Sequence, residues 1–389
     1  MIKINDKAIC CGCEACEQIC PKGCISMKRD EEGFLYPDVN ADMCIECGLC
    51  ESVCPFNNDK EYAPVIEAYA CISYNDNERF LSSSGGAFSL LAKEVIKDGG
   101  VVFGMKMTEN CEEAVFFMAQ NEDELSSLRG SKYVQGRVNG VYKRVKQELL
   151  NGKKVLFAGT PCQVNGLKLY LKKGYENLVC ADIICHGVPS PELWRKYAEY
   201  SEKKNKSKLK AVNFRSKEEN TTGYGLSMDF VNSKHCYTNK EYDEYMQMFL
   251  KNISLRPSCY NCKAKGYRLA DITLGDLWKA EKISPELTDS RGISFVILRN
   301  EKGHELFNKV ESTAKIKRID YNKAVQYNKS NFESVEIIPQ RAGFFDDMNN
   351  MTFSELSNKY VFTDSKSRLK KQLDNIGVMK IIKKIKNKY

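Results

Sequence analysis

Two cysteine runs near the N-terminus constrain this chain more than any other feature of its sequence. Each run reads C-x2-C-x2-C-x3-C and is followed by a proline. This spacing holds two 4Fe–4S clusters in a small domain: the first three cysteines of a run bind one cluster, and the fourth binds the other. The spacing therefore predicts one cluster on Cys10, Cys13, Cys16 and Cys54, and a second cluster on Cys44, Cys47, Cys50 and Cys20.

Other interpretations of the two runs fit less well. Zinc ribbons use paired C-x2-C knuckles rather than two triplets with a trailing Cys-Pro. A disulfide framework is typical of small secreted domains, whereas the first residues here show no signal-peptide pattern and no apolar run reaches the length of a membrane span. We therefore expect a cytoplasmic protein in which residues 1–60 form a small ferredoxin-like α+β domain.

The excess of basic charge is concentrated in the C-terminal tail. The 389 residues include 59 Lys or Arg and 51 Asp or Glu, and residues 365–389 hold nine of the former and one of the latter. Residues 1–364 are therefore formally neutral, and we expect no binding of nucleic acid by the body. Apolar residues recur at helical spacing in the tail, so residues 341–389 are predicted to end in a basic amphipathic helix. Such a helix is typical of peripheral contact with the inner membrane surface or of partner docking, and a frayed, solvated helix is the alternative.

Between these ends, apolar strands alternate with amphipathic helices. This alternation predicts an α/β (α+β) body with a mixed sheet and helices outside it. We divide the body into a region at 61–152 and a region at 153–340. The predicted strands are 101–105, 155–158, 178–184, 211–214, 226–231, 272–274 and 295–298, and the predicted helices are 86–97, 141–150, 164–171 and 191–202.

Four further cysteines form a candidate third metal site. Cys162 follows one buried strand and Cys185 ends the next, and the carboxyl ends of parallel strands share one edge of a sheet. Cys259 and Cys262 form a C-x2-C pair that can approach from outside the sheet, and four thiolates can hold a further 4Fe–4S cluster. A zinc half-knuckle or redox dithiol at Cys259 and Cys262, with Cys162 and Cys185 as small core residues, is the alternative.

Five motifs, in order along the chain, resemble those of the family of coenzyme F420 hydrogenase/dehydrogenase beta subunits. They are Ser82-Ser83-Ser84-Gly85-Gly86-Ala87-Phe88, Gly130-Ser131-Lys132-Tyr133-Val134-Gln135, Gly159-Thr160-Pro161-Cys162-Gln163, Cys185-His186-Gly187-Val188-Pro189, and Arg256-Pro257-Ser258-Cys259 continuing to Gly275-Asp276-Leu277-Trp278. The resemblance runs to about residue 320 and implies an iron–sulfur flavoprotein that binds FAD. It also favours the third cluster. Lys279 departs from the family pattern, which usually has glycine at this place.

The flavin site is predicted from motifs that precede and follow the first helix of the body. Ser83, Ser84, Gly85 and Gly86 precede that helix, where free backbone N–H groups suit a pyrophosphate, although an ordinary serine cap is the alternative. Lys132 and Tyr133 are further candidates for contact with the flavin. Lys132 and His186 are the candidate catalytic residues, with a surface lysine and a structural histidine as their alternatives.

These features predict an oxidoreductase that passes electrons between a one-electron donor and a two-electron acceptor through FAD. The acceptor is expected to be an organic molecule or a deazaflavin-type cofactor. The alternative is an electron-relay component of a larger redox complex without a substrate of its own. Relatives with a fused two-cluster domain are common in bacteria without the deazaflavin coenzyme, often beside surface-polysaccharide genes. The resemblance therefore leaves the substrate open.

Overall fold

The computed structural model describes residues 1–58, 64–218, 223–289 and 291–362. The predicted basic helix of the tail lies outside the described residues. No helix among the described residues is long and apolar enough to cross a bilayer.

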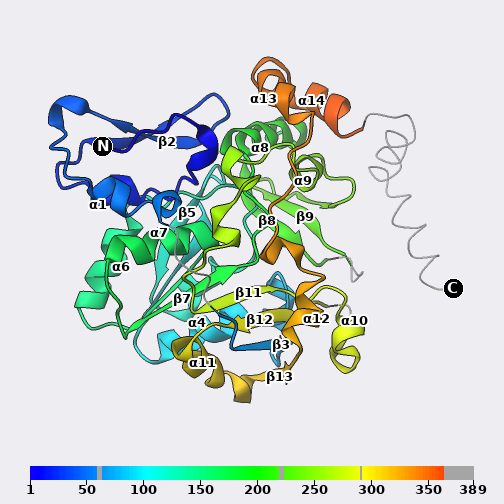
Figure 1. Ribbon diagram of the computed structural model, residues 1–389. Coiled ribbons are helices and arrows are strands. Elements are labelled where there is room, and N and C mark those ends of the chain that lie inside the picture. The colour runs from blue at the N-terminus through cyan, green and yellow to red at the C-terminus, as the bar shows by residue number, and fades with distance from the viewer. Residues whose placement is uncertain (59–63, 219–222, 290, 363–389) are drawn as a thin grey trace, which may run out of the picture.

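The N-terminal unit is a two-stranded antiparallel sheet with two short helices. Its strands are β1 (Ile25–Arg29) and β2 (Leu35–Val39), and its helices are α1 (Ala15–Ile19) and α2 (Leu49–Ser52). The Asp30 carboxylate accepts the Phe34 N–H at 2.8 Å and closes the turn between the strands. The predicted small α+β domain is confirmed. In Figure 1 it lies beside α6 (Val141–Leu150) and α7 (Pro161–Leu171), which α1 contacts.

An eight-stranded mixed sheet forms the centre of the body, as predicted. Its strand order is β13-β3-β12-β11-β7-β6-β4-β5. The four strands β4, β6, β7 and β11 run parallel, and the others join antiparallel. The strands are β3 (Glu67–Ser73), β4 (Val101–Met107), β5 (Ala114–Ala119), β6 (Val155–Gly159), β7 (Leu178–Ile183), β11 (Ile272–Asp276), β12 (Ser294–Leu298) and β13 (Ala314–Arg318).

Helices cover both faces of this sheet. Neighbouring residues of a strand point to opposite faces, so Leu156 packs with Leu91 of α4 (Ala87–Lys97), whereas Phe157 packs with Leu167 of α7. Burial on both faces explains why β6 is a continuous apolar run and why β4 and β7 each begin with one. The remaining helices of this part are α3 (Asp76–Leu81), α5 (Glu122–Ser126), α10 (Ala280–Ile283), α11 (Glu301–Asn308) and α12 (Tyr321–Val325).

A second, three-stranded sheet has a core of its own. Its order is β10-β9-β8, and aromatic rings such as Trp194, Tyr197 and Tyr245 pack against it. The C-terminal helices α13 and α14 contribute Phe344 and Phe353 to this core. The elements are α8 (Pro191–Asn205), β8 (Leu209–Ser216), β9 (Gly225–Phe230), β10 (His235–Asn239), α9 (Glu244–Leu250), α13 (Arg341–Asn350) and α14 (Phe353–Tyr360).

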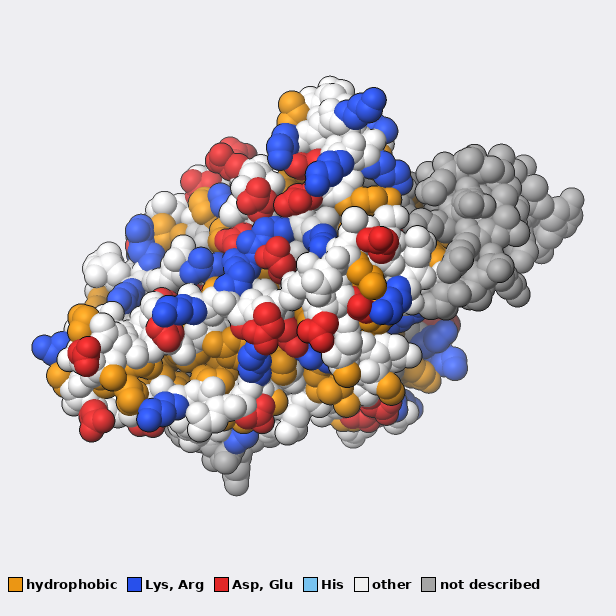
Figure 2. Space-filling view, turned by 90° about the horizontal axis from the view of Figure 1, so that it is seen from above, with side chains coloured by type: hydrophobic (Ala, Val, Ile, Leu, Met, Phe, Trp, Pro, Cys, Tyr) orange, Lys and Arg blue, Asp and Glu red, His pale blue; other side chains and the backbone are white. Residues whose placement is uncertain are grey.

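The surface carries charges of both signs. Figure 2 shows Lys and Arg interspersed with Asp and Glu over one face, with apolar side chains gathered along a band of it. This mixture agrees with the formal neutrality of residues 1–364.

Candidate redox site

The two cysteine loops of the N-terminal unit repeat one backbone conformation. In the first loop Gly12 (φ 67°) and Glu14 (φ 58°) are left-handed, and in the second loop Glu46 (φ 50°) and Gly48 (φ 72°) are left-handed. These residues stand two and four places after the first cysteine of each run. Left-handed residues at these places turn the chain tightly, so that three cysteines of one run can face a common centre.

The first predicted ligand set comes together in the folded chain. The thiol of Cys16 interacts electrostatically with the thiols of Cys10 and Cys54, and the thiol of Cys13 interacts with those of Cys16 and Cys54. Burial raises the pKa of Cys16 and of Cys54, and neighbouring thiols raise both further. Four thiolates at such close range, two of them buried and two half-buried, would repel one another unless they shared a cationic centre, so this donor set fits an iron–sulfur cluster.

The second predicted ligand set surrounds one small cavity. Cys20, Cys44, Cys47 and Cys50 line it together with Cys24. The Sγ atoms of Cys20 and Cys24 are 3.4 Å apart. Cys24 lies outside the repeated spacing, so sequence reasoning gave it no role.

The four further cysteines also line one cavity, with a volume of about 40 Å³. Cys162 is in the first turn of α7, which Thr160 and Gln163 cap reciprocally, and Cys185 follows β7. Cys259 ends a short 3-10 helix (Pro257–Cys259), and its thiol interacts electrostatically with the thiols of Cys262, Cys185 and Cys162. The parallel pairing of β6 with β7 brings Cys162 and Cys185 to the same sheet edge, as the sequence predicted.

Cys11 links the first ligand set to the four-cysteine cavity. Its thiol interacts electrostatically with those of Cys13 and Cys162, and Cys11 is itself part of the cavity wall. Among the described residues, no three His, Cys, Asp or Glu side chains are arranged to hold a single metal ion. The second ligand set and the four further cysteines instead each surround a cavity. Cys11 therefore joins two neighbouring cysteine sets that come from parts of the chain far apart in sequence.

A much larger cavity, of about 630 Å³, lies beside the four-cysteine cavity. Three of the four predicted phosphate-binding residues line it, namely Ser83, Ser84 and Gly86. Gly85 instead packs against the sheet, because a Cβ there would lie 2.1 Å from the Cys71 carbonyl oxygen and 2.6 Å from the Ser294 nitrogen.

The N-terminus of α4 faces this large cavity. The Ser294 hydroxyl accepts the N–H groups of Gly85 at 3.0 Å and Ala87 at 3.3 Å. The N–H groups of Phe88 and Ser89 follow on the same turn, where helix geometry leaves them no intrahelical acceptor, and both residues line the cavity. These donors at a helix N-terminus fit a pyrophosphate.

Lys132 and Tyr133 both line the large cavity. The Lys132 ammonium donates to the carbonyl oxygens of Ser127, Leu128 and Arg129 at 2.7–3.2 Å, and burial lowers its pKa to about 7. The Tyr133 ring stacks on Phe249 with the ring centroids 4.9 Å apart. Both side chains are therefore held by the protein itself at the cavity wall.

His186 lies in the wall shared by the two cavities. The segment from Cys185 to Val188 lines both the four-cysteine cavity and the large cavity. The His186 Nε2 atom is 2.7 Å from the Asn252 side-chain oxygen, the imidazole stands edge-on to Phe249, and burial lowers its pKa. His186 directly follows the candidate ligand Cys185 in the chain, so its imidazole lies next to the four-cysteine cavity.

Several residues at the rim of the large cavity were not among the predicted site residues. Arg215 binds the Asp276 carboxylate with both guanidinium nitrogens, at 2.6 and 3.0 Å, and lies over the ring of Tyr224. Trp278 is 43% exposed at the same rim. The motif from Gly275 to Trp278 was one signal that pointed to this region.

The departure at Lys279 coincides with a special backbone conformation. Lys279 has φ 55° and ψ 40°, which is the left-handed region that favours glycine. A lysine in this conformation carries strain that a glycine would avoid.

Comparison with known families identifies two domains. Residues 9–58 match the 4Fe-4S dicluster domain. Residues 152–324 match the family described as the C terminus of the coenzyme F420 hydrogenase/dehydrogenase beta subunit.

Two curated relatives match over most of this chain. The "Coenzyme F420-dependent sulfite reductase" of Methanocaldococcus jannaschii is 24% identical over 324 residues, which are 79% of this chain and 47% of that protein. The F subunit of the F(420)H(2) dehydrogenase of Methanosarcina mazei is 22% identical over 325 residues, which are 79% of this chain and 84% of that protein. The chain thus spans about half the length of the first relative.

A solved structure shares the fold. It is a chain of the F420-reducing [NiFe] hydrogenase complex from Methanosarcina barkeri, with a TM-score of 0.50 and 15% identity, covering 71% of this chain and 91% of that chain.

Proposed function

We propose that this chain is an iron–sulfur flavoprotein oxidoreductase. Its residues 9–58 match the 4Fe-4S dicluster domain, and its residues 152–324 match the family of coenzyme F420 hydrogenase/dehydrogenase beta subunits. It transfers electrons between a one-electron donor protein and a two-electron organic acceptor, for which a deazaflavin-type cofactor is one candidate. One observation carries the proposal: the segment from Cys185 to Val188 lines both the four-cysteine cavity and the large cavity.

Iron–sulfur clusters exchange single electrons, and a bound flavin exchanges them singly or in pairs. The twelve cysteines described above hold the clusters in three sets, of which the third is the proposed addition to the dicluster domain. The contact of Cys11 with both Cys13 and Cys162 supports short-range electronic coupling between the first and third sets.

The large cavity is the proposed FAD site. Its volume of about 630 Å³ lies within the range of cavities that hold cofactors and other small molecules. The N–H groups of Phe88 and Ser89 bind the pyrophosphate, and the hydroxyl of Ser83, which is 2.9 Å from that of Ser131, joins the two loops that enclose it.

Lys132 and His186 orient the bound cofactor from the cavity wall. All three ammonium protons of Lys132 go to backbone carbonyls, so its role is to fix the segment from Ser127 to Arg129 at the cavity wall rather than to exchange a proton with the acceptor. The hydrogen bond to Asn252 holds the His186 imidazole in one orientation beside Cys185. That position suits a hydrogen bond to a cluster sulfur.

Flavin content after anaerobic reconstitution with FAD tests the proposal. Ser84→Asp adds a negative charge at the proposed pyrophosphate site and is expected to abolish flavin binding with iron content unchanged. Ser126→Asp adds the same charge at an exposed residue outside the cavity wall, and it is expected to retain flavin. A wild-type chain that holds iron but no flavin would contradict the oxidoreductase and would favour the alternative of an electron-relay component.

Iron content tests the third set in the same preparation. Three clusters require about twelve iron atoms per chain, and two require about eight. Cys259→Ser is expected to remove about four of the twelve, whereas Cys236→Ser, which lies outside all three sets, leaves the count unchanged. Eight iron atoms in the wild type and in Cys259→Ser alike would refute the third cluster.

A further inference from the structure

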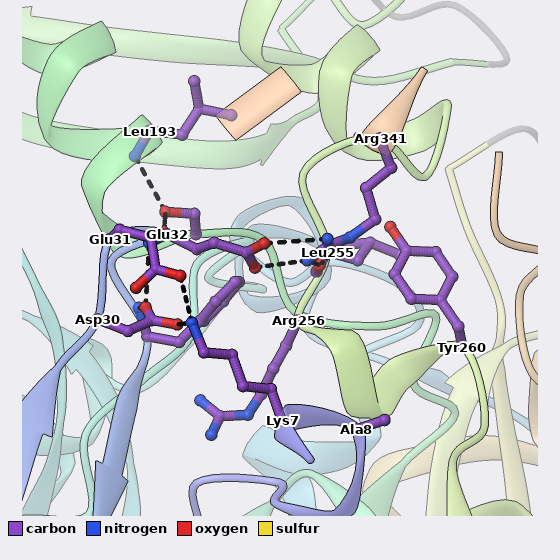
Figure 3. Close-up of polar contacts among 12 residues, drawn as sticks. Lys7, Ala8, Asp30, Glu31, Glu32, Leu193, Leu255, Arg256, Tyr260 and Arg341 are labelled. Atoms are coloured by element: carbon purple, nitrogen blue, oxygen red, sulfur yellow. Dashed lines mark hydrogen bonds and ion pairs between the residues drawn. The ribbon is translucent and has the colours of Figure 1, made fainter. Parts of the chain in front are cut away.

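Arg256 joins the third cysteine set to the first. It directly precedes the segment Pro257-Ser258-Cys259, its N–H donates to the Val188 carbonyl at 3.0 Å, and its own carbonyl accepts the Cys259 N–H at 2.9 Å. Its side chain leaves this loop and enters the N-terminal unit (Figure 3). One residue therefore has its backbone in one cysteine loop and its charge in another.

The guanidinium of Arg256 is bound directly to the first cysteine loop. Its Nε donates to the Cys10 carbonyl at 2.7 Å, and its Nη2 lies 3.5 Å from the Cys10 Sγ and donates to the Leu35 carbonyl at 2.9 Å. Its Nη1 donates to the Gln135 side-chain oxygen at 3.0 Å. The guanidinium also lies 4.2 Å from the centre of the Tyr36 ring.

This buried charge has no carboxylate partner in the part of the chain that the structure describes. Arg256 is 0% exposed, and its four acceptors among the described residues are two backbone carbonyls, an amide oxygen and a thiol sulfur. A fully buried guanidinium is costly unless an anion compensates it. The titratable groups that interact electrostatically with it are the thiols of Cys10, Cys11 and Cys259 and the hydroxyl of Tyr36, and burial raises the pKa of Tyr36, which keeps that hydroxyl neutral. Its counter-charge is therefore thiolate.

The loop is also shaped around this side chain. A Cβ at Gly12 would lie 2.9 Å from the Arg256 Nη1 and 2.6 Å from the Gln135 Nε2. A glycine at this place, which is also left-handed, lets the loop backbone lie against the guanidinium without displacing the Arg256 and Gln135 side chains.

We propose that Arg256 is the positioning residue that holds a positive charge against the cluster bound by Cys10, Cys13, Cys16 and Cys54. This charge raises the reduction potential of that cluster above that of the cluster bound by Cys20, Cys44, Cys47 and Cys50. The inference rests on the iron–sulfur part of the proposed function and not on its flavin. Each electron that this cluster accepts from its donor adds one negative charge, which the guanidinium stabilises. The second ligand set has no arginine bonded to its cysteines among the described residues.

Arg341 provides a matched control at the same junction. Its guanidinium binds the Glu32 carboxylate at 2.5 and 3.0 Å and the Leu255 carbonyl at 3.0 Å, so it also joins the N-terminal unit to the segment before Cys259 (Figure 3). Unlike Arg256, it has a carboxylate partner and no bond to a cysteine. Arg341→Gln therefore weakens the junction without changing the charge at a cluster.

The test is an anaerobic redox titration followed by electron paramagnetic resonance on the full chain. Arg256→Gln is expected to lower the reduction equilibrium constant of one N-terminal cluster about tenfold, a shift of about 59 mV to more negative potential, with the other cluster unchanged. Arg256→Lys is expected to recover part of this shift, and Arg341→Gln to show none. Equal potentials in Arg256→Gln and wild type, or an equal shift in Arg341→Gln, would overturn the proposal.

Iron content keeps the test decisive if Arg256→Gln loses a cluster. Loss of about four iron atoms in Arg256→Gln with retention in Arg256→Lys supports a role for the charge, whereas the same loss in both variants would overturn it. Flavin content is measured in the same samples. A chain without flavin would contradict the proposed oxidoreductase while leaving the Arg256 titration intact.

Discussion

Asp182→Asn is expected to destabilise the body strongly, because it leaves a buried arginine without its partner. The Arg268 Nη1 atom lies 2.9 Å from the Asp182 Oδ2, and the two side chains are 0% and 1% exposed. Asp182 is in β7, three residues before Cys185, and Arg268 follows Cys262 by six residues. The pair therefore ties together the two segments that carry the third cysteine set.

The expected loss is large. At this separation the attraction is about 6 kcal/mol for an effective dielectric constant of 20. Breaking a buried pair by removing one charge costs about 3–5 kcal/mol. An unfolding entropy of about 2.1 cal/mol/K per residue over roughly 300 residues converts this loss into a fall in Tm of about 5–8 °C.

The assay is anaerobic thermal unfolding at a fixed scan rate, followed by circular dichroism. The double variant Asp182→Leu/Arg268→Met replaces the pair with apolar side chains, and it is expected to be more stable than Asp182→Asn. The reasoning would be refuted if Asp182→Asn unfolded within about 1 °C of the wild type, or if the double variant were no more stable than the single one.

Three further predictions concern stability and the tail. Burial and the neighbouring Glu244 raise the pKa of Asp243 to about 7. Between about pH 4 and 7 the Asp243 carboxyl group is therefore protonated in the folded chain and ionised in the unfolded chain. The free energy of unfolding should therefore fall by about 1.4 kcal/mol per pH unit as pH rises through this range. Urea titrations at several pH values should show that the unfolding free energy of Asp243→Asn depends less steeply on pH than that of the wild type. Equal slopes for the two proteins would contradict the raised pKa of Asp243. Lys279→Gly should raise the free energy of unfolding by about 0.5–1 kcal/mol by removing left-handed strain, and a loss of stability would show that no strain is relieved. If the proposed peripheral membrane contact exists, anionic vesicles should retain the full chain and release residues 1–364, whereas equal retention would exclude it.

The strands buried on both faces could be predicted from sequence, and most of the edge strands could not. The run Val155-Leu156-Phe157 predicts β6 because both of its faces are covered by helices. β13 at the sheet edge carries Lys315 and Lys317, whose charge weakens any local strand pattern. β5 and β10 are edge strands as well and were missed. β3 lies inside the sheet but has small residues such as Ala68 and Ala70, so its strand pattern depends on neighbours far away in sequence.

Some residues of the candidate site could be predicted from the sequence, and others could not. Regular cysteine spacing predicts sets of ligands because the spacing itself encodes a loop around one centre. Cys11 and Arg256 have no such spacing, and their roles depend on contacts between the N-terminal unit and loops more than 100 residues away. The one signal for Arg256 was its place in the motif Arg256-Pro257-Ser258-Cys259, three residues before the first cysteine of the C-x2-C pair.

The most direct test of the central claim is the rate of flavin reduction by a reduced one-electron donor protein in an anaerobic stopped-flow experiment. Cys162→Ser is expected to leave the N-terminal clusters reducible but to slow flavin reduction about tenfold or more, which corresponds to at least about 1.4 kcal/mol of activation free energy. Cys236→Ser should react at the wild-type rate. Flavin reduction at an unchanged rate in Cys162→Ser would contradict the claim that the third cysteine set connects the dicluster domain to the large cavity.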